Sequence, residues 1–267
     1  MKTIKNIGLK NVQAVYSGPE GDLWELVMGE QIHIGGFQSS MDLAKRAGIG
    51  AGMHGIDLCC CSGAGMRFLV KFCGVGSMRG VDATAKVVEC GRQRCQALGL
   101  DKQISFTLAD VCATGLPAGS ADFIWGEDAW CYVEDKSKLI AEAAQLVRPG
   151  GPIAFTDWME GPVPMSAAEV ERYLAFMKFP SVLSLADYRA LLQANGCNVR
   201  LAEDTGRFPK YVPLYLDMIE KQLTYDALKI IGFDTALAQT LIGEMRFMQT
   251  LADAGKIIQG LIVAQKA

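Results

Sequence analysis

Histidine, excess basic charge and long apolar runs are scarce in this sequence. Its 267 residues include two histidines, and 26 Lys and Arg against 29 Asp and Glu give a net charge of −3. Without a basic patch, neither nucleic acid nor an anionic membrane surface is the expected partner. The longest apolar stretches fall well short of the roughly 20 residues that a membrane helix needs. We therefore expect a protein that binds neither nucleic acid nor a membrane.

Targeting and metal-binding signals are also lacking. Residues 1–5 contain two lysines with no apolar run after them, which is not the pattern of a signal peptide. The nine cysteines form neither a CxxC pair nor a Cys/His zinc pattern. Cys59, Cys60 and Cys61 are adjacent, so their side chains point in different directions and do not suit one metal ion. We expect a cytoplasmic protein with free thiols and no metal.

Apolar segments of strand and helix type alternate from about residue 54 onward. The expected strands are residues 55–58, 78–82, 104–108, 121–125 and 153–156, followed by 198–202 and 257–264. The expected helices are residues 66–72, 84–98, 136–147, 166–178, 184–195, 211–231 and 236–254. This alternation predicts an α/β fold with a parallel sheet and helices on both faces.

Acidic residues stand where three of these strands end. They are Asp57, Asp82 and Asp110, and the small-residue loop 59–65 follows the first. In an open parallel sheet, ligands bind at the carboxyl ends of the strands. A carboxylate after the second strand suits ribose hydroxyls, and one after the third suits an adenine amino group. An acid before the loop would repel a pyrophosphate but attract a sulfonium or amino group, which favours S-adenosylmethionine (SAM) over NAD.

At these residues the sequence resembles the class I SAM-dependent methyltransferases. Their first motif is commonly (V/L)-D-(L/I)-G-x-G-x-G, and residues 56–63 fit it except that Cys59 and Cys61 stand in place of glycine. If either position requires a positive φ, a non-glycine residue costs roughly 1–2 kcal/mol. Four later motifs match in order, at Gly80-Val81-Asp82, Leu108-Ala109-Asp110 with Leu116-Pro117, residues 121–125, and residues 146–151. The resemblance covers roughly residues 20–200.

The resemblance implies a Rossmann-like, mainly parallel seven-stranded sheet with a helical cap. The implied division is an N-terminal helical cover (1–50), a SAM-binding core (51–160), a helical substrate cap that includes the sixth strand (161–255) and a final core strand (256–267). The implied partner is a small-molecule substrate, and a homodimer is left open. The residues expected at the cofactor are Asp57, Cys59, Cys61, Gly63, Asp82, Ala83, Asp110, Val111 and Glu127.

Three segments narrow the resemblance. Residues 28–36, 66–71 and 127–132 look like those of the sarcosine/dimethylglycine and phosphoethanolamine N-methyltransferases. In those families the N-terminal segment covers the cofactor, and a (Q/R)DA segment, matched here by Asp128, lines the amine site. Phosphoethanolamine enzymes commonly have histidine where this chain has Tyr132, so the sequence departs from them there.

Methyl transfer to an amine needs a neutral nitrogen, and an alkylamine with a pKa near ~10 is about one part in a thousand neutral at pH 7. Asp128 is the first choice for the catalytic group that receives the proton, with His33 or Tyr132 as alternatives. A helix cap is the structural alternative for Asp128, and His33 is more often a structural hydrogen-bonding residue. Aromatic rings hold methylated ammonium groups, and those available are Tyr16, Trp130, Tyr132 and Trp158. Either tryptophan can instead belong to the core.

Other functions stay open on the sequence. The acceptor can be a carbon or oxygen of a larger metabolite, because this fold serves many acceptors. The altered glycine loop also fits a SAM-binding or thiol-sensing protein without catalysis. The basic candidates for binding a substrate carboxylate are Arg172, Arg189, Arg207 and Lys210.

Overall fold

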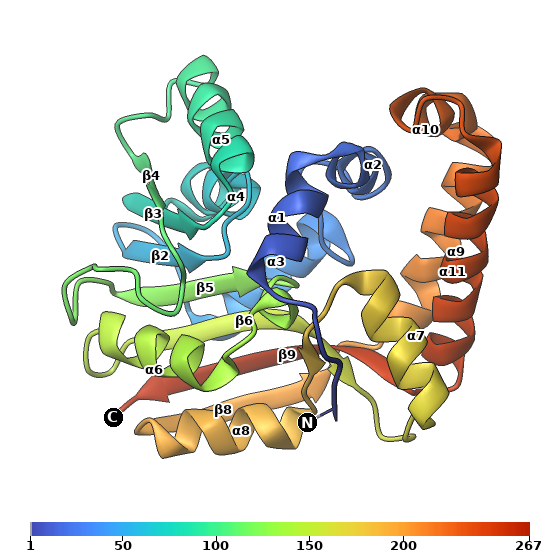
Figure 1. Ribbon diagram of the computed structural model, residues 1–267. Helices are drawn as coiled ribbons and strands as arrows, with labels where there is room; N and C mark the ends of the chain where they lie inside the picture. Colours follow the sequence, from blue (N-terminus) through green and yellow to red (C-terminus); the bar gives the residue numbers. More distant parts are fainter. Residues whose placement is uncertain (1) are drawn as a thin grey trace.

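A seven-stranded sheet forms the centre of the computed structural model, which describes residues 2–267 (Figure 1). Residue 1 of the predicted cover segment lies outside the described residues. The strand order is β4-β3-β2-β5-β6-β9-β8. The bounds are β2 (His54–Leu58), β3 (Ser77–Asp82), β4 (Ile104–Leu108), β5 (Phe123–Glu127), β6 (Pro152–Glu160), β8 (Cys197–Asp204) and β9 (Ile257–Lys266). β9 is antiparallel to both of its neighbours, whereas β2 to β6 pair in parallel.

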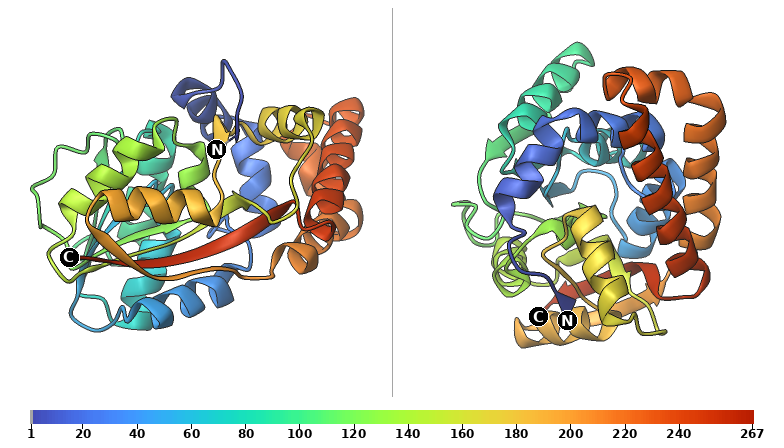
Figure 2. Two further views of the ribbon diagram at one scale, coloured as in Figure 1. Left: turned by 90° about the horizontal axis from the view of Figure 1, so that it is seen from below. Right: turned by 45° about the vertical axis from the view of Figure 1, so that its right-hand side comes forward.

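Helices cover both faces of this sheet, which confirms the predicted Rossmann-like architecture (Figures 1 and 2). The helices that follow the strands are α4 (Ala64–Cys73), α5 (Ala85–Ala97), α6 (Lys136–Leu146) and α8 (Leu185–Ala194). Ile56 and Leu58 of β2 pack in one core with α6 and α8, while Phe123 and Trp125 of β5 pack in a second core with α4. Successive side chains of a strand face opposite sides, so the apolar strands supply both cores.

The remaining helices are α1 (Leu9–Ser17), α2 (Pro19–Met28), α3 (Gly36–Ala47), α7 (Ala167–Met177), α9 (Phe208–Asp217), α10 (Thr224–Ile230) and α11 (Thr235–Asp253). Most of them lie beyond the carboxyl ends of the strands, whereas α3 covers the same face of the sheet as α4. In Figure 1, α1 and α2 lie between α5 and the upright group α9–α11. A third core joins α2, α7, α9 and α11 around Tyr173, Phe179 and Phe208. A short pair, β1 (Lys2–Thr3) with β7 (Ser181–Val182), and the 3₁₀ turn Trp130–Tyr132 complete the elements.

The sequence predicted the seven strands, with β5 displaced two residues along the chain. The predicted single helix over residues 211–231 is wrong, because α9 ends at Asp217 and a π-helical turn, Met218–Gln222, precedes α10. There the Leu223 N–H donates to the Met218 carbonyl five residues back, and the Thr224 hydroxyl donates to the Ile219 carbonyl at 2.7 Å. A threonine hydroxyl that bonds to the backbone competes with the regular helical pattern. The four-part domain division remains a prediction.

No helix within residues 2–267 combines the length and the apolar character needed to cross a membrane.

Candidate active site

A pocket of about 640 Å³ opens at the carboxyl ends of β2, β3, β4 and β5. The strand order changes direction at β2, whose neighbours are β3 and β5, and such a switch point leaves a crevice where ligands bind. Residues of α1 and the segment 30–32 line the pocket from the opposite side. The site therefore lies between the strand ends and the N-terminal helices.

The loop after β2 holds two cysteines in the left-handed backbone region. Cys59 has φ +66° and Cys61 has φ +48°, and both line the pocket. The Cys59 and Cys60 N–H groups donate to the Val81 carbonyl, and the Cys61 N–H donates to Asp82 Oδ2 at 2.9 Å. The condition stated for the sequence is thus met: both cysteines occupy a conformation that favours glycine. Gly63, with φ +76°, is the N-cap of α4.

Two buried carboxyl groups, those of Asp57 and Glu127, lie against the first turn of α4. A Cβ at Gly65 would lie 2.7 Å from Glu127 Oε2 and 3.6 Å from Asp57 Oδ2, so glycine leaves room for both acids. Burial raises the pKa of Asp57, and its proximity to Glu127 and Asp82 raises it further. Burial also raises the pKa of Glu127, which His33 and Ser40 partly offset. A cation placed between these acids would be stabilised by both.

Asp82 and Asp110 end β3 and follow β4, and both line the pocket. Asp82 Oδ1 accepts the Thr84 N–H at 2.8 Å, which together with the Cys61 N–H fixes the carboxylate. Asp110 Oδ1 accepts the Cys112 N–H at 2.9 Å. Ala83 and Val111, which follow the two acids, also line the pocket. Each carboxylate oxygen has about two acceptor sites, so both groups retain capacity for a ligand.

Asp128 connects the N-terminal segment at Ile34 with Gln259 of strand β9. Its Oδ2 accepts the Ile34 N–H at 2.8 Å, and Gln259 Nε2 lies 3.0 Å from Oδ1 and 2.8 Å from Oδ2. The residue is 4% exposed, has φ +50° and lines the pocket. Burial raises the pKa of its carboxyl, and His33 partly offsets this. Asp128 thus reaches the pocket while most of its acceptor sites hold protein donors.

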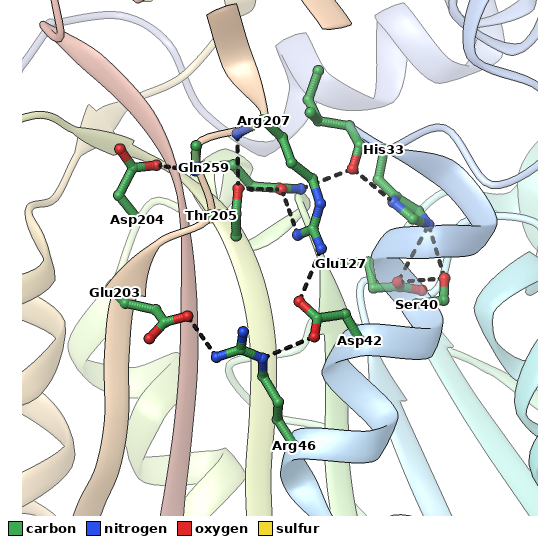
Figure 3. A network of polar contacts seen from close by, with 12 residues as sticks. His33, Ser40, Asp42, Arg46, Glu127, Glu203, Asp204, Thr205, Arg207 and Gln259 are labelled. Carbon is green, nitrogen blue, oxygen red and sulfur yellow. Dashed lines mark hydrogen bonds and ion pairs between the residues drawn. The ribbon is translucent and has the colours of Figure 1, made fainter. Parts of the chain in front are cut away.

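His33 contacts the site through Glu127. Its Nε2 lies 3.2 Å from Glu127 Oε1 and 3.2 Å from Ser40 Oγ, and the Ser40 hydroxyl donates to Glu127 Oε1 at 2.7 Å (Figure 3). Trp125 Nε1 donates to Glu127 Oε2 at 3.0 Å. His33 is 1% exposed. The imidazole is therefore placed to orient Glu127 rather than to touch an acceptor.

Tyr16 of α1 and Tyr132 meet edge to face at the pocket wall. Their ring centroids are 5.5 Å apart at 84°, and both residues line the pocket. Burial raises the pKa of each phenol well above its usual range. Tyr132 therefore remains protonated at neutral pH, which weakens its case as the group that receives a proton.

Comparison with known proteins assigns the central part of this fold. Residues 56–155 match the family described as "Methyltransferase domain". The chain carries a methyltransferase domain. The matched residues run from β2 to β6 and include the acids at the ends of β2, β3, β4 and β5.

The similarity to individual proteins covers more of the chain than residues 56–155. The "27-O-demethylrifamycin SV methyltransferase" of Amycolatopsis mediterranei is 29% identical over 161 residues, which cover 55% of this chain and 59% of the relative. "Phosphoethanolamine N-methyltransferase 1" of Arabidopsis thaliana is 26% identical over 216 residues, 80% of this chain and 43% of the relative. The chain thus spans less than two thirds of these relatives.

Among solved structures, a phosphoethanolamine N-methyltransferase 2 of Haemonchus contortus, in complex with phosphomonomethylethanolamine and S-adenosylhomocysteine, superposes with a TM-score of 0.84. It is 18% identical and covers 95% of this chain and 58% of that one. At this identity the likeness shows the fold.

Two tryptophans expected at the substrate lie in hydrophobic cores, Trp130 in the core that contains α6 and α8 and Trp158 in the third core. Trp130 is fully buried, stacks on Phe155 with centroids 4.0 Å apart, and donates to the Leu58 carbonyl at 3.1 Å. Trp158 packs on Phe208 at 4.5 Å. Neither lines the pocket as the structure describes it. Their position does not support a substrate role, because both indoles are buried in the protein interior.

Lys136 was not anticipated at the pocket, whereas Glu30 and Gln31 belong to segment 28–36, which was expected to cover the cofactor but was not assigned residue by residue. Gln259 was also missed, although a signal existed: it stands in the otherwise apolar stretch 257–264, where a polar side chain needs a buried partner. The basic candidates for a substrate carboxylate lie elsewhere: Arg172 pairs with Glu244, Arg207 pairs with Asp42, and Arg189 and Lys210 are exposed. None of the four lines the pocket.

Proposed function

We propose that this chain transfers a methyl group from SAM to the nitrogen of a small amine. The observation that carries the proposal is the set of carboxylates at four neighbouring strand ends, Asp57, Asp82, Asp110 and Glu127, around one pocket of the methyltransferase domain. A nucleoside with a positively charged tail suits such a set, because hydroxyl and amino groups donate to carboxylates and the cationic tail is attracted to them.

The residues present fit the cofactor by the chemistry of their donors and acceptors. Asp82, fixed by two backbone N–H groups, would accept from the ribose hydroxyls. Asp110 and the Val111 backbone would hold the adenine. Asp57 and Glu127 would accept from the ammonium group, and Cys59, Cys61 and Gly63 would line the methionine end.

SAM supplies an electrophilic methyl group on a sulfonium, so the chain has to position a neutral acceptor nitrogen in line with it. Asp128 is the proposed orienting carboxylate and proton acceptor. Ile34 and Gln259 occupy most of its acceptor sites, and a carboxylate has about four, which leaves capacity toward the pocket. Tyr16 and Tyr132 would present their rings and neutral hydroxyls to the amine.

A larger metabolite is the second candidate acceptor. The observation that favours it is the relative named for 27-O-demethylrifamycin SV, which aligns over 161 residues of this chain. A third reading, cofactor binding without catalysis, follows from the two cysteines that replace glycine at the pocket. The larger-metabolite reading and the non-catalytic reading each predict an outcome different from amine methylation when labelled SAM is offered with a panel of acceptors.

Asp82→Ala tests the cofactor assignment. Loss of charge-assisted hydrogen bonds of about 1.5–3 kcal/mol should weaken SAM and S-adenosylhomocysteine binding about 10- to 100-fold in calorimetric titration. Asp101→Ala, a change at an exposed acid outside the pocket, should bind normally. Equal affinity in the two variants would refute the placement of the ribose.

Labelled SAM with a panel of acceptors tests the reaction. Transfer to an amine is expected. Transfer to hydroxyl or carbon acceptors alone would favour the larger metabolite, and binding without any transfer would favour the non-catalytic reading.

A further inference from the structure

We infer that the methyl acceptor is an amine without a phosphate or carboxylate group, an inference that rests on the proposed function. Eight of the side chains that line the pocket are carboxylic acids and two are lysines. Four acids are assigned to the cofactor above. The other four, Glu30, Asp128, Glu134 and Asp135, also line the pocket, with Glu30 paired to Arg67 and Asp135 paired to Lys138. Their charge favours a cationic or neutral ligand over an anionic one.

The buried lysine of the pocket has no donor left for an anion. Lys136 is 3% exposed, and its Nζ donates to the Cys131 carbonyl at 3.1 Å, to the Val133 carbonyl at 2.6 Å and to Ser181 Oγ at 3.1 Å. An ammonium group has three N–H donors, so these three acceptors use all of them. Burial also lowers the pKa of Lys136. The residue fastens the segment after β5 to β7 and does not offer a free charge to the pocket.

The second lysine is solvated and paired. The Lys138 side chain is 72% exposed, and its Nζ lies 3.2 Å from Asp135 Oδ2. Asp135 is also the N-cap of α6 and accepts the Lys138 N–H at 2.9 Å. A carboxylate therefore already occupies the helix end that could otherwise attract an anion.

The arginines near the pocket are directed to the protein's own acids. Arg67 donates to the Ser62 carbonyl and to Glu30 Oε2 at 2.6 Å, and Arg94 pairs with Glu25. Neither appears in the pocket lining of residues 2–267. The first turn of α4 offers backbone N–H groups at Ala64 and Gly65, and the carboxylate of the cofactor has the prior claim on them.

Related proteins named for phosphoethanolamine act on a substrate that carries a phosphate. The charges of this pocket oppose such a group, so the acceptor does not follow from the shared fold. The acceptor class that fits is an alkyl or hydroxyalkyl amine, held by carboxylates and by Tyr16 and Tyr132.

Matched pairs of amines test this inference in two ways. Ethanolamine is compared with phosphoethanolamine, and N-methylethylamine with sarcosine, by competition binding to the full chain with S-adenosylhomocysteine present and by kcat/KM with labelled SAM. The member without an acidic group should bind and react at least about tenfold better, which equals about 1.4 kcal/mol.

The two readouts separate the inference from the proposed function. Transfer to no member would end the proposed function, while the binding ratio would still decide the inference. An anionic member that binds as tightly as its partner, or a panel in which no amine binds, would overturn the inference.

Glu134→Lys exchanges one of these acids for a cation and replaces no residue assigned to the cofactor or to proton transfer. It should raise the relative kcat/KM and relative affinity of the anionic members about tenfold. Glu171→Lys, the same change at an exposed position of α7 outside this pocket, should leave the ratios unchanged. Identical ratios in the two variants would show that pocket charge does not set the preference, and would count against the inference.

Discussion

Cys59 and Cys61 hold backbone conformations that usually belong to glycine. Both have positive φ, and their N–H groups donate to Val81 and Asp82 at the end of β3. The hydrogen bonds secure the turn regardless of the side chain, whereas the Cβ atoms carry the steric cost. An unbranched thiol is therefore tolerated where a branched side chain should not be.

Substitution at Cys61 should show this difference. Cys61→Val must place a branched Cβ at φ +48° and should lower the free energy of unfolding by about 1–3 kcal/mol. Cys61→Gly should stay within about 1 kcal/mol of the parent, because relief of strain offsets the greater freedom of glycine in the unfolded chain. Denaturant titration measures both.

Cys90→Val provides the control, since it removes a thiol on the regular helix α5. A Cys61→Val variant no less stable than Cys90→Val would contradict the assignment of strain to residue 61.

At the scale of elements, one polar network fastens the cover segment to the last strands. Arg207 Nη2 donates to Asp42 Oδ2 of α3 at 2.9 Å, and its Nη1 donates to Gln259 Oε1 of β9 at 3.2 Å (Figure 3). Gln259 Nε2 in turn donates to the Ile34 carbonyl at 3.0 Å and to Asp128. The glutamine thus links the cover, the pocket and the sheet through buried hydrogen bonds, which are worth more than exposed ones.

A substitution at Gly35 tests the contribution of this network to stability. It has φ +86° at the start of α3, and a Cβ there would lie 2.8 Å from Arg207 Cδ. Gly35→Ala should therefore lower the free energy of unfolding by about 2–3 kcal/mol, combining backbone strain with displacement of Arg207. Gly48→Ala, at the other end of α3 with φ +67° and open space around it, should lose only about 1 kcal/mol. Equal losses in urea titrations would exclude a role for the Arg207 contact.

Sequence patterns predict the elements of this fold better than the directions of its side chains. Alternating apolar segments predicted the strands, and the acids at or just after the ends of β2, β3 and β4 predicted Asp57, Asp82 and Asp110 at the pocket. The fate of Trp130 was not predictable, because its burial on Phe155 depends on the neighbouring strand β6. The same holds for Asp128, whose partner Gln259 is 131 residues away.

For the whole molecule, the buried carboxyl group of Asp157 makes stability depend on pH. Asp157 is fully buried, accepts the Cys131 N–H at 2.9 Å and the Tyr188 hydroxyl at 2.5 Å, and has a pKa raised by burial to about 6. Between about pH 4 and pH 6 the folded state retains this proton while the unfolded chain, with a carboxyl pKa of about 3.9, releases it. Stability from this group therefore falls as pH rises through that window.

Asp157→Asn should remove this dependence. Relative to the variant, the parent should lose up to about 3 kcal/mol of unfolding free energy from pH 4 to pH 7. This loss follows because the folded-state pKa of Asp157 lies about two pH units above that of the unfolded chain. Denaturant titrations at pH 4, 5, 6 and 7 measure the shift. Parallel stability curves for the two proteins would contradict a raised pKa at Asp157.

The position of β9 has a consequence for synthesis. β9 lies between β6 and β8 although it follows every other strand in the chain. While the ribosome is still translating residues 257–266, the edges of β6 and β8 that later pair with β9 have no partner, and unpaired edges invite wrong pairing with other chains. Nascent chains that stop before Gln259 also lack its hydrogen bonds to Asp128, which leaves the Ile34 N–H as the donor to that carboxylate. Productive folding of the pocket is therefore delayed until translation of the last strand, and chaperone demand should be highest just before it.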